Sequence, residues 1–218
     1  MTFPSRTTSL AATAVAAAAS ALAFPFLPKR VATHFNEAGK PDRYSSRAAA
    51  AIMLPATMLI IEAVNDRLGG WPGGSDRESQ NSGTRARDEA VGWVELALLP
   101  PHLAILANGL GAHVDMNRLQ RADLGIMMLS LGNVLPKLPR NGLIGIRTPW
   151  TLADPANWER THRMGGYLMT VGGLLTIASL PLSDKRAARI PIVTMLSAVG
   201  LSTAYSLITY LQRDQPER

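Results

Sequence analysis

The stretch IPIVTMLSAVGLSTAYSLITYLQ, Ile190 to Gln212, contains no charged residue and decides the class of fold. A helix that crosses the hydrocarbon core of a bilayer needs about 20 mostly apolar residues, and this stretch reaches that length. Its polar side chains are almost all Ser, Thr and Tyr, whose hydroxyls a bilayer tolerates inside a helical bundle. A helix of this length on a soluble protein would show a polar face instead. The stretch therefore predicts a transmembrane helix.

Similar uncharged gaps recur along the chain, although its overall hydrophobic content of 47% is ordinary. They predict six membrane-spanning helices, at about residues 8–28, 47–65, 91–112, 122–138, 164–182 and 190–211. The expected fold class is therefore an all-α, polytopic integral membrane protein. The alternative is a soluble helical bundle with a large core, which would need polar helix faces. The positive-inside rule favours, by a small margin, both termini in the cytoplasm.

The first predicted helix has a second interpretation, as a cleaved signal peptide. Arg6 and an Ala-rich run precede the tripeptide Ala21-Leu22-Ala23, which resembles a cleavage site. The apolar run continues to Leu27, however, and this continuation favours retention of the helix. A polar segment, Lys29 to Arg47, follows, and its Asn, Gly and Pro residues predict a loop.

Composition divides the chain into three regions. Residues 1–65 contain the first two predicted helices and the loop between them. Residues 66–90 are polar and rich in Gly, Ser and charge, which predicts a flexible linker with solvated arginines at Arg77, Arg85 and Arg87. Residues 91–218 hold the other four predicted helices as one membrane region.

Several classes of function find no support in the sequence. The chain has no Cys, which excludes disulfides and thiolate metal sites. Its four His residues have no partner at metal-ligand spacing, and no nucleophile elbow, P-loop or dinucleotide fingerprint is present. The net charge of +6 comes from residues spread over loops and segment ends, which suits lipid phosphates better than nucleic acid. We therefore expect no enzyme, no catalytic residue, no cofactor, no metal and no nucleic-acid partner.

The region GNVLPKLPRNGLIGIRTPWTLADPANWERTHRMGGY, Gly132 to Tyr167, joins two predicted helices with residues that an ordinary linker does not need. Within it, Asp154-Pro155 predicts the start of a helix, because an N-cap residue precedes a Pro at the first helical position. Trp158 and His162 are four residues apart and share a face of that helix. The Gly pairs at 165–166 and 172–173 indicate close helix packing rather than phosphate binding. We call residues 132–167 the signature region.

The signature region resembles the SdpI immunity-protein family, bacterial membrane proteins that protect a toxin-producing cell from its own peptide toxin. The resemblance is carried by Leu135-Pro136-Lys137, by Pro139-Arg140-Asn141 and above all by the run GIRTPWTL from Gly145 to Leu152. A weaker resemblance, in THFNEAGKPDRYSSR from Thr33 to Arg47, is to a short uncharacterised bacterial domain that often precedes such a region.

This resemblance implies a non-enzymatic protein of the bacterial cell membrane that gives resistance to a membrane-active peptide toxin. The implied partners are the lipid bilayer, a peptide toxin and, in some members of the family, a cytoplasmic repressor that the membrane protein captures. Such capture would add a signalling role.

The signature region supplies the first set of candidate site residues. They are Asn133, Pro136, Lys137, Arg140, Asn141, Gly145, Arg147, Thr148, Pro149, Trp150, Trp158, His162 and Arg163. Arg147 beside Trp150 at a membrane surface can hold a phosphate or a carboxylate while the indole ring lies among the headgroups. In the alternative, structural interpretation, Arg147 and Arg163 cap helix ends and the tryptophans are interface anchors.

A second candidate site lies within the predicted helices, where ionisable groups are costly and often functional. Glu62 ends the second predicted helix and Glu95 begins the third, so both lie near the same membrane face. His102 follows Glu95 by two turns on one helical face. These residues predict a proton or cation site, and with it the alternative function of a small ion-coupled transporter. The structural interpretation is snorkelling of the carboxylates, with His102 hydrogen-bonded between helices.

Overall fold

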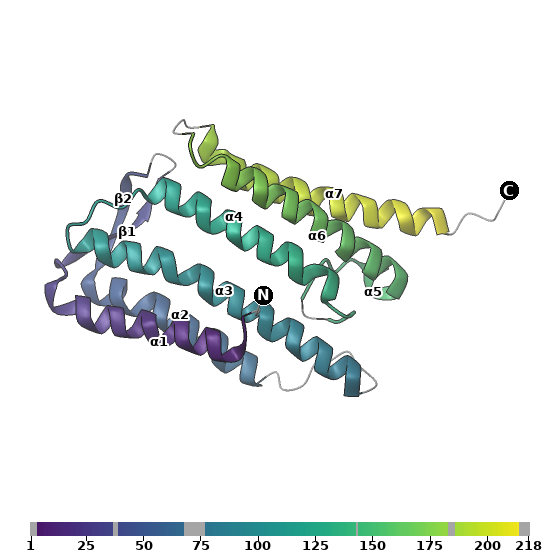
Figure 1. The fold of residues 1–218 in the computed structure, drawn as a ribbon, viewed down its shortest axis with the longest axis horizontal. Coiled ribbons are helices and arrows are strands. Elements are labelled where there is room, and N and C mark those ends of the chain that lie inside the picture. Colours follow the sequence, from purple (N-terminus) through teal and green to yellow (C-terminus); the bar gives the residue numbers. More distant parts are fainter. Residues whose placement is uncertain (1–3, 37–38, 68–76, 143, 183–185, 214–218) are drawn as a thin grey trace.

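The computed structural model describes residues 4–36, 39–67, 77–142, 144–182 and 186–213. These residues form an elongated helical bundle with a β-hairpin at one end (Figure 1). The main elements are α1 (Arg6–Ala23), β1 (Arg30–Phe35), β2 (Pro41–Ser46), α2 (Arg47–Arg67), α3 (Arg77–Gly109), α4 (Met116–Val134), α5 (Pro149–Ala153), α6 (Pro155–Ala178) and α7 (Ile190–Arg213). Three short 3₁₀ turns, η1 (Phe24–Phe26), η2 (Leu135–Lys137) and η3 (Ala187–Arg189), adjoin α1, α4 and α7.

Helix α3 lies between two groups of helices (Figure 1). It packs against α1 and α2 on one side and against α4 on the other, while α4 packs on α6 and α6 on α7. The all-α class predicted from the sequence is confirmed, with the hairpin as an addition. The division into residues 1–65, 66–90 and 91–218 stays a prediction, and α3 contacts helices from both of the outer regions.

The surface of the bundle is that of a membrane protein. Among the described residues, four helices are long and apolar enough to cross a membrane: α1 with η1, α2, α3 from Gly83, and α7 with η3. On α7, Ile192, Leu196 and Leu201 are each more than half exposed, which suits contact with lipid. A multi-pass membrane protein is thus confirmed. The count of six spans stays a prediction, because α4 and α6 each carry charged residues near their first turns.

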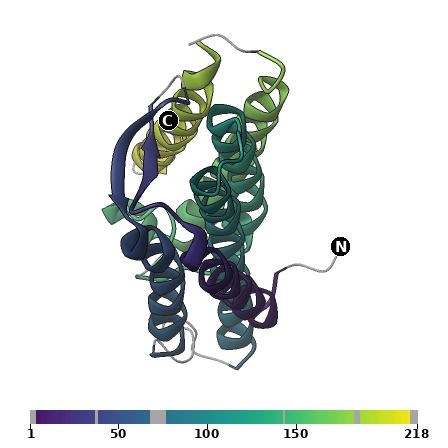
Figure 2. The ribbon, with the colours of Figure 1, turned by 90° about the vertical axis from the view of Figure 1, so that its left-hand side faces the viewer.

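The segment 29–47 forms an antiparallel β-hairpin and not the predicted loop. Figure 2 shows this hairpin at the end of the bundle that faces the viewer, extending from α1 and α2 towards α7. Val31 and Phe35 are buried against α3, and they alternate with outward residues as in a strand. Pro41 stands at the first position of β2, where proline is tolerated.

Helix α3 begins at Arg77, so the predicted flexible linker, 66–90, is wrong from that residue onwards; residues 68–76 lie outside the described part of the chain. Ala86, Ala90 and Trp93 pack into the core at helical spacing. The Gly, Ser and charge content of the segment obscured this short apolar stripe.

Arg85 and Arg87 of the predicted linker differ in exposure, and the side chain of Arg77 lies outside the described part of the structure. Arg85 is exposed, as expected. Arg87 is buried, and its guanidinium lies 3.6 Å from the Asp88 carboxylate, so the prediction that it is solvated is wrong. The cause is helix α3, which directs the Arg87 side chain towards the bundle, where it pairs with Asp88.

Close backbone contact holds α4 against α6, which confirms that the glycine pairs serve helix packing. A Cβ atom on Gly166 would lie 2.8 Å from the Gly132 carbonyl oxygen, and one on Gly173 would lie 2.8 Å from the Gly125 carbonyl oxygen. The two contacts are seven residues apart on both helices, so they recur after two turns on the same face. Small residues at such positions allow the backbones to approach, as in other membrane helices.

We expect Gly166→Ala to destabilise the protein by about 1–3 kcal/mol, because the added methyl group meets backbone and Pro136 atoms that cannot move freely. Gly200→Ala on α7 is the matched control, since a Cβ atom there meets nothing within 4 Å. Thermal unfolding in detergent measures both. Equal midpoints for Gly166→Ala and the wild type would contradict the close contact.

Candidate functional site

The candidate site is built on the loop 138–148, which we call the signature loop, between η2 and α5. It lies at the end of the bundle opposite the hairpin (Figure 1). Asp154 caps α6 as predicted, because its side chain accepts a hydrogen bond from the Ala156 N–H at 3.0 Å. Thr148 and Thr151 form a capping box at the start of α5, where Pro149 takes the first helical position.

Asn141 fixes the turn of the signature loop from inside. Its buried side chain donates from Nδ2 to the carbonyl oxygens of Pro139, at 2.9 Å, and Ile144, at 3.0 Å. Its Oδ1 accepts from the Ile144 N–H at 2.8 Å. An amide alone offers both donors and an acceptor here, because a carboxylate can only accept.

Further along the loop, the backbone of Gly145 packs directly against the His162 ring. Gly145 has φ of +117°, and a Cβ atom there would overlap the His162 ring, so only glycine fits. His162 accepts the Ile146 N–H at Nε2, at 3.0 Å, and its Nδ1 lies 2.8 Å from the Trp158 carbonyl oxygen. The imidazole is therefore the neutral tautomer with its proton on Nδ1. Its role is to hold the loop, and both nitrogens are occupied.

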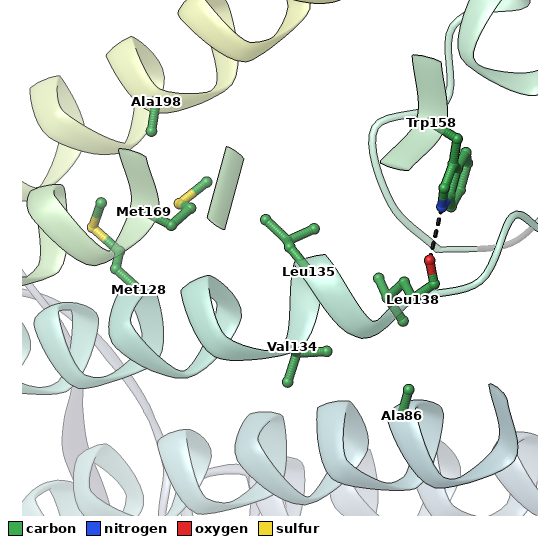
Figure 3. Close-up of a cluster of buried hydrophobic side chains, with 8 residues drawn as sticks. All are labelled: Ala86, Met128, Val134, Leu135, Leu138, Trp158, Met169 and Ala198. Carbon is green, nitrogen blue, oxygen red and sulfur yellow. Dashed lines mark hydrogen bonds between the residues drawn. The ribbon is translucent and has the colours of Figure 1, made fainter. Parts of the chain in front are cut away.

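Trp158 anchors the loop to the largest apolar cluster of the protein. Its indole Nε1 donates to the Leu138 carbonyl oxygen at 2.8 Å, and its ring stacks on His162 at 4.0 Å between centroids. Figure 3 shows Trp158 beside this cluster, to which α3, α4, α6 and α7 all contribute: Ala86, Met128, Val134, Leu135, Leu138, Trp158, Met169 and Ala198. The prediction that Trp158 and His162 share a helix face is confirmed.

Other candidate residues tie the signature region to neighbouring elements. Lys137 Nζ and Asn133 Nδ2 both reach Glu89 of α3, at 3.2 and 2.9 Å. Arg140 donates to the Leu152 carbonyl oxygen at 2.6 Å. The remaining two lie at helix surfaces: Pro136 packs against Gly166, and Arg163 forms an exposed ion pair with Glu159 at 3.7 Å.

Arg147 differs from all of these. Its side chain is exposed, and it makes no ion pair or hydrogen bond with any residue that the structure describes. The backbone on either side is held, by the Ile146 N–H bond to His162 and by the Thr148 cap. Nearby, the Trp150 indole N–H donates to Ser206 and its ring stacks on Tyr210 at 6.2 Å. The loop therefore presents a free guanidinium from a rigid support.

The second candidate set, Glu62, Glu95 and His102, is buried in the bundle of α1, α2 and α3. Each of the three is hydrogen-bonded to a hydroxyl group of α1, at Ser9, Thr13 and Ser20 respectively. Sequence reasoning missed these hydroxyls. The signal was their spacing within an Ala-rich helix, which places them on one face. It also missed Glu89, because that residue fell within the predicted linker.

The fold and these sites define a multi-pass membrane protein without a recognisable catalytic constellation in its described residues. Residues 137–209 match the SdpI/YfhL protein family, and residues 11–59 match a domain of unknown function, DUF1648. The chain is also 25% identical over 191 residues to the Immunity protein SdpI of Bacillus subtilis (strain 168), covering 88% of each chain. No solved structure matches. The resemblance read from the signature region is confirmed: residues 137–209 are similar to the SdpI/YfhL family, and residues 11–59 are similar to DUF1648.

We expect Asn141→Asp to lower the stability of the protein by about 1–3 kcal/mol, because a carboxylate would face the two carbonyl oxygens that the amide now donates to. Asn81→Asp is the matched control, since Asn81 is exposed on α3. The midpoint of thermal unfolding in detergent gives the comparison. The same midpoint for both variants would show that Asn141 does not hold the loop.

Proposed function

We propose that the protein is a non-enzymatic immunity protein of the bacterial cell membrane, which protects the cell against a membrane-active peptide toxin. The match to an immunity protein over 88% of the chain supports the class of function. The family region that includes the signature loop supports the location of the site.

The observation that carries this proposal is the exposed, unpaired guanidinium of Arg147. In the same loop Asn141 is buried and hydrogen-bonded, and the buried Thr151 of α5 donates to the Ile146 carbonyl oxygen, so these two residues explain the loop's shape. Arg147 contributes nothing to that shape. A free cation held in one direction by a rigid turn is suited to binding an anionic group, and guanidinium binds carboxylates and phosphates with two parallel hydrogen bonds.

Trp150 defines the surroundings of this cation. Its ring is half-buried between α5 and α7, where Ser206 and Tyr210 hold it. Indole rings favour the headgroup level of a bilayer, and this preference supports a position of Arg147 at the membrane surface. A peptide lying in that surface would meet the guanidinium with its acidic side chains or its carboxyl terminus.

A second candidate function is ion-coupled transport, which the buried Glu62, Glu95 and His102 favour. The two functions respond differently to charge-neutral substitution. Glu62→Gln and Glu95→Gln should abolish transport and leave protection through the signature loop largely intact.

We expect Arg147→Ala to abolish toxin protection while membrane abundance stays near that of the wild type, because the exposed side chain makes no hydrogen bond or ion pair with the described residues. The assay uses a Bacillus subtilis strain that lacks Immunity protein SdpI and carries this protein instead. Its growth is measured in the presence of the peptide toxin that the strain itself produces. Trp150→Ala should also reduce protection, since it removes the support beside Arg147.

Arg85→Ala is the control, because Arg85 is likewise an exposed arginine but lies on α3. It should protect as the wild type does. An Arg147→Ala protein that is abundant and fully protective would refute the proposed site.

A further inference from the structure

Two buried carboxylates of the N-terminal bundle are bound to adjacent turns of α1. Glu62 of α2 is hydrogen-bonded to the Ser9 hydroxyl, which also lies 2.9 Å from the Arg6 carbonyl oxygen, and Glu95 of α3 accepts a hydrogen bond from the Thr13 hydroxyl at 2.5 Å. Ser9 and Thr13 are four residues apart, about one turn, so the two carboxylates are neighbours across α1 and interact electrostatically. Only 4% of Glu62 and 0% of Glu95 is exposed.

Each carboxylate has one oxygen atom without a donor. Glu62 Oε2 and Glu95 Oε1 are buried and make no hydrogen bond to any described residue. An ionised carboxylate in apolar surroundings requires donors or a cation to offset the loss of its hydration. One hydroxyl for each carboxylate does not supply this.

Among the described residues, no Lys or Arg pairs with Glu62 or Glu95. Arg67, at the end of α2, is exposed. The cations that are paired at this end of α1, α2 and α3 have other acidic partners: Arg6 with Asp66 at 2.7 Å, Arg87 with Asp88 at 3.6 Å and Lys137 with Glu89 at 3.2 Å. The two carboxylates are therefore left as neighbouring like charges inside the bundle.

His102 lies two turns beyond Glu95 on α3. It is hydrogen-bonded to Ser20, which lies on the same face of α1 as Ser9 and Thr13. Ser20 donates its hydroxyl to the Ala51 carbonyl oxygen at 2.6 Å, so towards His102 Nε2, at 2.8 Å, it acts as an acceptor. The Ala16 carbonyl oxygen, at 3.3 Å from Nε2, can only accept. Nε2 therefore carries the proton. Nδ1 is left as a buried acceptor that no described residue hydrogen-bonds.

We propose that Glu62 and Glu95 form a proton-binding pair inside the membrane and hold one exchangeable proton between them. Two carboxylates in contact with one apolar environment cannot both ionise, and a shared proton removes the repulsion while leaving one charge. No group of three or more His, Asp or Glu side chains among the described residues is arranged to hold a metal ion, so a proton fits the pair better than a metal. This proposal does not depend on the immunity function.

The test is labelling of the full chain in native membrane vesicles with N,N′-dicyclohexylcarbodiimide. This apolar reagent adds a protonated carboxyl group across its carbodiimide bond and leaves an N-acylurea, which mass spectrometry locates. We expect a single label per chain, on Glu62 or Glu95, at neutral pH, and less labelling as the pH is raised. Glu89, buried but paired with Lys137, is the internal control and should stay unlabelled.

Substitution then tests whether the proton is shared. Glu95→Gln removes the neighbouring charge, so labelling of Glu62 at neutral pH should fall by about tenfold or more. Glu62→Gln should do the same to Glu95. Glu159→Gln, at an exposed carboxylate of α6, should leave both curves unchanged.

Four results would overturn the proposal. The first three are no label on either residue at any pH, labels on both in one chain, and labelling of Glu62 that is unchanged in Glu95→Gln. Reduced labelling when Na⁺ replaces K⁺ at constant pH would assign the pair to a metal cation and would also overturn it. The first two results need no variant, so they hold even where a substituted chain does not fold.

Discussion

The close contact between α4 and α6 is the constraint on which the rest of the structure depends. At Gly132 and Gly166 the two backbones lie too near each other for any side chain. Lipid provides no hydrophobic force that drives helices together, so dense packing of this kind must hold them. The contact sets the end of α4 beside the middle of α6, and the signature loop and α5 have to lead the chain from there to the start of α6. Trp158 then fastens the loop to the core beneath it.

Residues that shape the protein use their polar atoms in internal hydrogen bonds, whereas residues available to a ligand leave polar atoms without a partner. In the signature loop, Asn141 and His162 use their polar atoms on the loop itself. Arg147 uses none. In the N-terminal bundle, Glu62 and Glu95 each use one oxygen and leave the other without a donor. Unsatisfied groups inside apolar surroundings are costly, and they persist where a task requires them.

The sequence was sufficient for the features that depend on local pattern. Uncharged apolar runs predicted the helices, and Asp154-Pro155 predicted the start of α6, because a cap and a fixed φ act within a few residues. The hairpin and the first turns of α3 were missed, since short apolar stripes such as Val31 to Phe35 are hidden among charges and acquire their meaning only against α3. The hydroxyl partners of Glu62 and Glu95 were missed for a related reason. They come from a helix distant in sequence, and no local pattern pairs them.

Helix α3 contacts both candidate sites and so connects them. Glu89 contacts the signature region through Lys137, and Glu95 contacts α1 through Thr13. These two glutamates are six residues apart, about 9 Å along the helix. A substitution that shifts α3 therefore disturbs both sites at once and cannot assign a function to either. Among the described residues Arg147 makes no hydrogen bond or ion pair with α3, and the replacement of Glu62 by Gln keeps the shape of the side chain. Substitution of Arg147 and replacement of Glu62 by Gln can therefore distinguish a surface that recognises a toxin from a buried pair that holds a proton.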